Sequence, residues 1–372
     1  MGMTSWERMV LALVAIAVIA AVAVLVGKQA SRLRNLARIT AVITFGLIVL
    51  GAYVRLSDAG LGCPDWPGCF GQFTPSLAAE SIEHAHAQAP HGPVSAHKAW
   101  KEMVHRYLAM LVGCLIVAMA ICATRQKDDL KRRTPSRPVL AWATVVVVIV
   151  QAVLGAWTVT WLLKPAIVTL HLLGGMATLA LLVWYAQTQR PGPAGNSQLR
   201  RLRPMARLAL ATLLIQITLG GWVSTNYAAA VCGELPLCQG QILPPMDFPN
   251  GFHVVRELGK TAQGSNLALP ALTAIHMAHR IFAIAVLLVF VLLIVRAARV
   301  AGGRRYALAL SLALAAQIAL GLKLVWAMAA SHLDLSIHLP LAAGHNAVAA
   351  LLWTLTLLIN YESQAAQRAL NR

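Results

Sequence analysis

The stretch EMVHR at residues 102–106 stands near the start of one long apolar run, and HMAHR at residues 276–280 stands near the start of another. Two further apolar runs carry His171 and His345. The spacing from His105 to His171 is 66 residues (171 − 105), and the spacing from His279 to His345 is also 66 (345 − 279). This equality indicates that one unit with two histidines is used twice.

The composition is that of a membrane protein. Of the 372 residues, 58% are hydrophobic and only 12% are charged, and apolar runs of about 18 residues or more recur, which is the length that crosses a bilayer core. The formal net charge is +18, but the Lys and Arg residues mostly lie in short joints between the runs, as membrane orientation requires. This pattern argues against nucleic acid as a partner and predicts an all-α polytopic protein in the lipid bilayer.

The apolar runs predict the membrane-spanning helices. We expect spans at about 9–27, 36–56, 99–123, 139–162, 165–187, 205–226, 271–298, 305–329 and 338–361. Joints rich in Lys and Arg alternate with joints that are nearly free of them, so we place the basic joints inside. The long joints at residues 57–98 and 227–270 then lie outside the membrane.

The first run stands apart from the rest. Its positive charges follow it and no convincing small-residue cleavage site is present, so we expect residues 1–30 to form an extra N-terminal span. A signal peptide is the alternative. Residues 31–190 and 200–365 are then expected to form two tandem four-helix halves.

The two halves repeat each other. LGAYV at residues 50–54 matches LGGWV at residues 219–223 with an offset of 169 residues, and the histidines match with an offset of 174. The difference of five residues falls in the outer joints, where insertions are tolerated. An even number of spans separates the halves, so we expect two pseudo-symmetric bundles with the same orientation.

The four histidines predict a heme protein. All four lie near the outer ends of helices that run inward, so their imidazoles are expected at one depth. Imidazoles from two facing helices are a common way to hold a heme iron from both sides, and Arg106 and Arg280, next to two of them, can pair with propionates. There are two alternatives. Each histidine could form only a hydrogen bond to a neighbouring helix, or the histidines could belong to a zinc site.

One position distinguishes the halves. Glu102 lies three residues before His105 and shares its helix face, whereas His276 holds the matching position before His279. A carboxylate in a partly dry site can act in proton transfer; the alternative is an interface carboxylate paired with Lys98 or Arg106. The asymmetry suggests one site for chemistry and one for electron supply.

Two cysteine pairs lie in the outer joints. Cys63 and Cys69 enclose five residues, as do Cys232 and Cys238, and an outer joint in bacteria faces an oxidising compartment. We predict the disulfides Cys63–Cys69 and Cys232–Cys238; redox-active thiols are the alternative. Cys114 and Cys122 lie within a span and are expected to be small core residues.

Taken together, these motifs resemble the heme A synthase family, and the resemblance covers nearly all of residues 36–361. Its pieces are GAYVRL at 51–56 leading into GLGCPDWPGC at 60–69, then EMVHR at 102–106, HLLGG at 171–175, HMAHR at 276–280 and GHN at 344–346. The extra N-terminal span and the cysteine pairs in both halves depart from the family pattern or vary within it. These differences leave open the route by which electrons are transferred.

The resemblance implies an oxidoreductase that converts the C8 methyl group of heme O to a formyl group by two successive hydroxylations. His105 and His171 would flank the substrate heme, His279 and His345 would ligate a heme b cofactor, and Glu102 would be catalytic. Further candidates for propionate or pocket contacts are Arg55, Arg106, Arg280 and His276.

The resemblance also implies a setting. The protein would lie in the bacterial inner membrane with its heme sites near the periplasmic side, and heme O synthase would be its upstream partner; a homo-oligomer is left open. Two other functions fit the four histidines: a di-heme b-type cytochrome for electron transfer, and a heme-handling protein without catalysis. Glu102 in one half only favours the enzyme.

Overall fold

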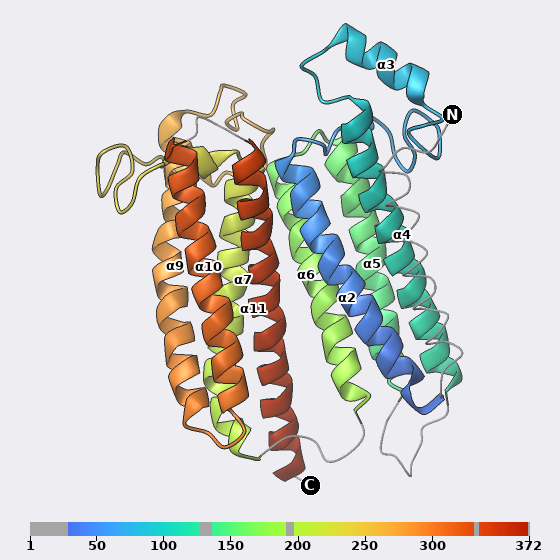
Figure 1. Cartoon of the computed structure of the whole chain (residues 1–372), viewed down its shortest axis with the longest axis vertical. Helices are drawn as coiled ribbons and strands as arrows, with labels where there is room; N and C mark the ends of the chain where they lie inside the picture. The colour runs from blue at the N-terminus through green and yellow to red at the C-terminus, as the bar shows by residue number, and fades with distance from the viewer. Residues whose placement is uncertain (1–28, 127–135, 191–196, 331–334, 371–372) are drawn as a thin grey trace. The chain divides into compact units, whose positions relative to one another are not determined.

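The computed structural model describes residues 29–126, 136–190, 197–330 and 335–370. The regular secondary structure of these residues is helical (Figure 1). The helices are α2 (Gln29–Leu56), α3 (Ala79–Gln88), α4 (Ala96–Arg125), α5 (Pro138–Thr160), α6 (Pro165–Thr188), α7 (Arg203–Thr225), α8 (Phe248–Gly251), α9 (Leu269–Ala298), α10 (Arg304–Ala330) and α11 (Leu335–Leu370), with the 3-10 turns η1 (Ser197–Leu202) and η2 (Ala228–Val231).

Within these ranges, eight helices are long and apolar enough to cross a membrane: α2, α4, α5, α6, α7, α9, α10 and α11. The predicted all-α polytopic membrane fold is therefore confirmed. The predicted extra span at residues 9–27 lies outside the described residues. Most of these helices begin before the expected limits, as α2 does at Gln29, and α11 also ends later, at Leu370, whereas α5 and α7 end one or two residues earlier than expected.

Contacts divide the chain into two compact units, and the division falls inside α6. The first unit contains α2 to α5 and the part of α6 that begins at Gly174. The second unit contains residues 161–173, at the start of α6, together with α7 to α11.

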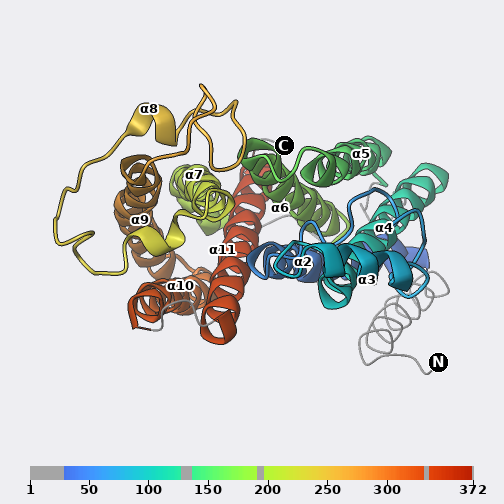
Figure 2. The same cartoon turned by 90° about the horizontal axis from the view of Figure 1, so that it is seen from above.

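The four long helices α7, α9, α10 and α11 of the second unit form a closed ring. α7 packs on α9, α9 on α10, α10 on α11, and α11 on α7. The view from above in Figure 2 shows α9 and α11 on opposite sides of this ring. Side chains on the inner faces of α9 and α11 therefore point toward one another across the bundle.

The first unit follows the same plan. α4 packs on both α2 and α5. Gly174 of α6 packs against the Gln151 side chain of α5, and Gly175 of α6 faces Ile48 of α2. Helices α4 and α6 are thus separated by α2 and α5, as α9 and α11 are separated by α7 and α10.

Threonine hydroxyls inside the helices bond to the backbone of their own helix. The hydroxyl of Thr40 donates to the carbonyl oxygen of Leu36 at 2.8 Å, and Thr44 donates to Thr40 at 2.7 Å. Bonds of this kind keep a hydroxyl paired where no water is available. The first residue of α5 and of α6 is a proline. The N–H of this first position has no partner within the helix, so a proline there does not remove a helical hydrogen bond.

Each unit has one disulfide loop at one end of its long helices. We call this end the disulfide end. The structure has both predicted bonds, Cys63–Cys69 and Cys232–Cys238. The loops close alike: Cys69 pairs through its backbone with Gln72, and Cys238 pairs with Gln241. The outer joint of the first unit also contains helix α3, which we did not expect because its ten residues are few and mostly polar.

The turn between α9 and α10 gives a test of close packing. A Cβ at Gly303 would lie 2.2 Å from the carbonyl oxygen of Ala297, so Gly303→Ala should lower the stability of the protein by about 1–3 kcal/mol. Thermal unfolding in detergent measures this change.

Gly113→Ala is the matched control, because nothing lies within 4 Å of its Cβ position and alanine favours the helix. An unfolding temperature that does not differ between Gly303→Ala and Gly113→Ala would contradict the packing at this turn.

Candidate functional site

In each unit, one predicted histidine packs against a glycine of the neighbouring helix. His105 on α4 faces Gly51 on α2, where an added Cβ would lie 2.9 Å from the ring atom Cε1. His279 on α9 faces Gly220 on α7, where the corresponding distance is 3.0 Å. Gly51 and Gly220 are equivalent in the repeat, so both imidazoles lie against bare helix backbone.

The remaining two histidines lie on α6 and α11. A Cβ at Gly321 of α10 would lie 3.2 Å from Cε1 of His345. The side-chain nitrogen of Gln317, also on α10, is 3.0 Å from Nε2 of His345. His171 lies in the part of α6 that belongs to the second unit, whereas His105 lies in the first.

The second unit brings its two histidines together. His279 and His345 come from the opposed helices α9 and α11, and each imidazole lies against a glycine of one of the two helices between them, Gly220 on α7 and Gly321 on α10. Nδ1 of His345 is buried and has no hydrogen-bond partner within the described ranges. Partly buried imidazoles on opposed helices, with glycine where a side chain would fill the space, fit a heme iron held from two sides.

Zinc fits less well. No group of three or more His, Cys, Asp or Glu side chains that could hold a metal ion is found among the residues that the structure describes. A protein zinc site needs such a cluster. The donor set within these residues is instead a set of imidazoles on separate helices.

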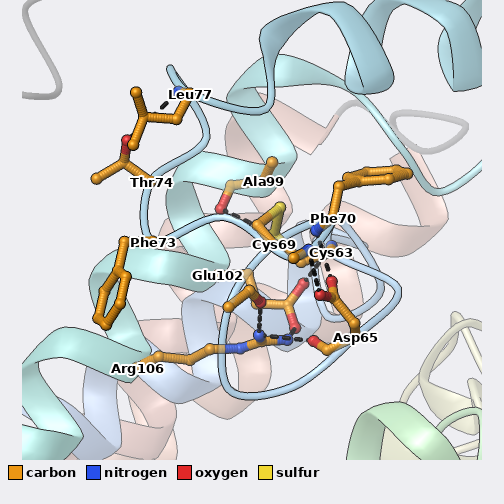
Figure 3. Close-up of a disulfide and its surroundings, with 12 residues drawn as sticks. Cys63, Asp65, Cys69, Phe70, Phe73, Thr74, Leu77, Ala99, Glu102 and Arg106 are labelled. Atoms are coloured by element: carbon orange, nitrogen blue, oxygen red, sulfur yellow. Dashed lines mark hydrogen bonds and ion pairs between the residues drawn. A yellow bond between two sulfur atoms is a disulfide. The ribbon is translucent and has the colours of Figure 1, made fainter.

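Glu102 is buried, with 4% of its surface exposed. One carboxylate oxygen, Oε2, accepts a hydrogen bond from the backbone N–H of Cys63 at 2.9 Å. The other, Oε1, pairs with Nη2 of Arg106 at 2.5 Å. Figure 3 shows this carboxylate between the disulfide loop and Arg106.

Arg106 binds the same loop. Its Nη1 donates to the carbonyl oxygens of Asp65 at 2.8 Å, Pro67 at 3.3 Å and Gly68 (Figure 3). We call Glu102, Arg106 and the backbone of residues 63–68 the first loop anchor. Four hydrogen bonds to the main chain join the first disulfide loop to α4. The ion pair between Glu102 and Arg106, both on α4, holds the two side chains that make these bonds.

The second unit has a corresponding anchor made with a different residue. Arg280 donates to the carbonyl oxygens of Glu234 at 2.8 Å, Leu237 at 3.1 Å and Cys232. Its Nε also donates to Nε2 of His276 at 2.9 Å, and Nδ1 of His276 lies 2.8 Å from the carbonyl oxygen of Ala228. We call these contacts the second loop anchor.

The hydrogen bonds of the second loop anchor define the protonation state of His276. Because Nε2 accepts from Arg280, Nδ1 must carry the proton that is donated to Ala228. His276 is therefore a neutral imidazole whose two nitrogens are both used. The first anchor contains a carboxylate at the matching position, so only the first half has an acidic group there.

A sequence profile described as cytochrome oxidase assembly protein (COX15-CtaA) matches residues 34–357. The heme A synthase of Shewanella oneidensis is 36% identical over 330 residues, which is 88% of this chain and 95% of that protein. The chain belongs to the heme A synthase family.

More distant relatives carry the same name. The heme A synthase of Caulobacter vibrioides is 27% identical over 340 residues, which is 84% of this chain and 91% of that protein. That of Halalkalibacterium halodurans is 27% identical over 227 residues, covering 59% of this chain and 69% of that protein. Membership of the heme A synthase family makes the chain an enzyme of heme A biosynthesis.

The structure locates the arginine candidates. Arg106 and Arg280 are directed at loop carbonyls by the contacts above, and their pairing with propionates stays a prediction. Arg55 lies in the last turn of α2, four residues after Gly51, and so on the same face of that helix. This face is the one that packs on His105.

Some polar residues of this heme A synthase family member were not found from the sequence. Gln216 contacts His279, and Gln317 contacts His345. Arg256, with 5% of its surface exposed, bonds to Asn226 and lies over the Trp222 ring at 5.6 Å; burial lowers the pKa of its guanidinium. A glutamine inside an apolar span is itself a signal of function, and it could have identified the first two.

The first loop anchor can be tested by removing Arg106. Each hydrogen bond from a charged group contributes about 1.5–3 kcal/mol, so Arg106→Ala should free the loop. We expect hydrogen exchange at the amides of residues 63–73 to be faster by at least about tenfold.

Arg125→Ala is the control, since Arg125 is exposed in the last turn of the same helix. Unchanged exchange in Arg106→Ala would show that the contacts do not hold the loop.

Proposed function

We propose that the chain is a heme A synthase that oxidises the C8 methyl group of heme O to a formyl group. The observation that supports this most directly is the pairing of two similar histidine sites with a buried carboxylate, Glu102, beside only one of them. An electron-transfer protein with two equal hemes predicts equal surroundings for the two sites. An enzyme with one reacting heme predicts a difference of this kind.

The reaction has two hydroxylations. Each one adds an oxygen atom from water to the methyl carbon and releases two electrons and two protons to acceptors outside the product. The second hydroxylation gives a geminal diol, which loses water to leave the formyl group. The protein must therefore hold the substrate heme in one orientation, and must remove protons beside one methyl group.

His279 and His345 hold the cofactor, a heme b. Two features support this assignment. The two histidines lie on opposed helices, and a glycine lies against each ring, Gly220 at His279 and Gly321 at His345. When bound, a heme b supplies one-electron transfer. The residues of the chain fix the ring orientations and exclude water from the bundle interior.

His105 and His171 hold the substrate heme. His105 has the same glycine contact as His279, and His171 is the repeat equivalent of His345. The bacterial inner membrane is the proposed location, with the disulfide end toward the periplasm. A sparingly soluble heme O is best received directly from heme O synthase, its proposed upstream partner.

Glu102 is the proposed catalytic residue. It lies one helical turn from His105, and its two oxygens are fixed by the Cys63 amide and by Arg106. A carboxylate held in this way can take a proton from the methyl group or from water, or stabilise positive charge that develops on the carbon. Arg55, Arg106, Arg280 and His276 are the candidates to border the heme propionates or the pocket.

The first test is chemical. The hemes extracted from purified protein should include heme O, heme A or a hydroxylated intermediate beside heme b, identified by chromatography and mass. Heme b alone in both sites would favour a di-heme b-type cytochrome instead.

Substitutions at Glu102 separate chemistry from structure. Glu102→Gln keeps an oxygen that can accept from Cys63 or Arg106 but cannot take a proton as a carboxylate does, so heme should stay bound while heme A formation falls by at least about a hundredfold. Glu102→Ala should lose product in the same way. Product is measured by heme analysis after co-expression with a heme O source.

Glu83→Ala is the control, because Glu83 is an exposed carboxylate on α3. Normal heme A from Glu102→Gln would remove the carboxylate from the mechanism.

The glycine contact gives a second test. A methyl group at Gly220 would lie 3.0 Å from Cε1 of His279, which forces the ring to move. We therefore expect Gly220→Ala to reduce the heme b content and to change the low-spin absorption spectrum. Gly46→Ala, where nothing lies within 4 Å, should keep both at the level of the unmodified protein, and an equal heme content in the two variants would oppose the assignment of His279.

A further inference from the structure

Gln216 contacts the ring of His279 from the same helix as Gly220. Its side-chain nitrogen lies 3.1 Å from Nδ1 and 3.4 Å from Nε2 of His279, and it donates to the His279 carbonyl oxygen at 3.1 Å. Gln216 precedes Gly220 by four residues, so both lie on one face of α7. This face of α7 therefore contacts the His279 imidazole at two adjacent turns. Gly220 contributes bare backbone at one turn, and Gln216 contributes a side-chain amide at the other.

The first half has no such amide. The offset of 169 residues that relates Gly220 to Gly51 relates Gln216 to Leu47. The other glutamine is present in both halves: QAVLG at residues 151–155 matches QIALG at residues 317–321 with an offset of 166. Gln216 is therefore a polar residue specific to the second half.

An amide inside a membrane bundle is costly unless it is bonded. The neighbours of Gln216 on α7 at Leu213 and Ile217 are buried apolar residues. Its oxygen Oε1 is buried and has no hydrogen-bond partner in the part of the chain that the structure describes. The amide thus carries an unused acceptor beside the ring.

A histidine that binds a metal through one ring nitrogen carries its proton on the other. A half-turn of the Gln216 amide exchanges its oxygen and nitrogen and places Oε1 against the ring. The oxygen can then accept from the ring N–H. This exchange gives up the bond to the His279 carbonyl oxygen, which lies within α9 and keeps its place in the helix.

We propose that Gln216 is a positioning residue that accepts the ring proton of His279 and thereby lowers the reduction potential of the second-half heme. An acceptor on this proton makes the imidazole a stronger electron donor and stabilises ferric iron. The inference rests on the proposed function, because it requires His279 to bind heme b.

Gln216→Met and Gln216→Leu test the proposal. Methionine has nearly the shape of glutamine without its hydrogen-bonding groups, and leucine reproduces the first half. We expect both variants to retain heme b and to raise its midpoint potential in spectroelectrochemical titration of the detergent-solubilised full-length protein. Thr218→Val is the control on α7, since this hydroxyl only bonds within its own helix, to Leu214.

The outcomes separate the two proposals. A midpoint potential that stays equal to that of Thr218→Val, with heme b fully bound, overturns the role of Gln216 and leaves the proposed function standing. Loss of heme from Gln216→Met also overturns it, because the amide would then be needed to hold the ring. If His279→Ala keeps the full heme b signal, the proposed function itself fails.

Discussion

The contact between a bare stretch of helix and an imidazole ring is the constraint on which both halves depend. The space that a Cβ would fill at Gly51 is within 2.9 Å of His105, and the space at Gly220 is within 3.0 Å of His279. Inside a bilayer, no water is available to form hydrogen bonds with a polar ring that is out of place. Contacts within the protein must therefore fix each ring, and glycine allows two helices to approach closely enough for the ring of one to lie against the backbone of the other.

The two halves share this scaffold and differ in what surrounds it. The first half has a carboxylate in its loop anchor, at Glu102, and the second has a neutral imidazole, at His276. The first has a hydrocarbon next to its glycine, at Leu47, and the second has an amide, at Gln216. Each exchange changes the charge or hydrogen bonding near a histidine, while the glycine contact of that histidine is kept in both halves, so a duplicated bundle can assign different tasks to its two sites.

Much of this architecture can be predicted from the sequence. The spans follow from the length of the apolar runs, and the disulfides follow from matched cysteines in matched outer joints. The partners of Arg106 and Arg280 could not be predicted, because backbone carbonyl oxygens carry no sequence signature. Gln216 could have been noticed as a polar residue inside an apolar span, but its contact with His279 could not be predicted, and helix α3 is too short and polar to be identified from an apolar run.

The loop anchors recognise the main chain. Arg106 binds the carbonyl oxygens of Asp65 and Gly68, and Arg280 binds those of the equivalent Glu234 and Leu237. The side chains between the cysteines take no part in these bonds, and the two loops, PDWPG and GELPL, share only one proline in register. Evolutionary drift can therefore change most of the loop sequence while its attachment persists. Asp65 is more constrained, because its carboxylate accepts from the backbone N–H groups of Phe70 and Gly71 at 2.6 and 2.7 Å.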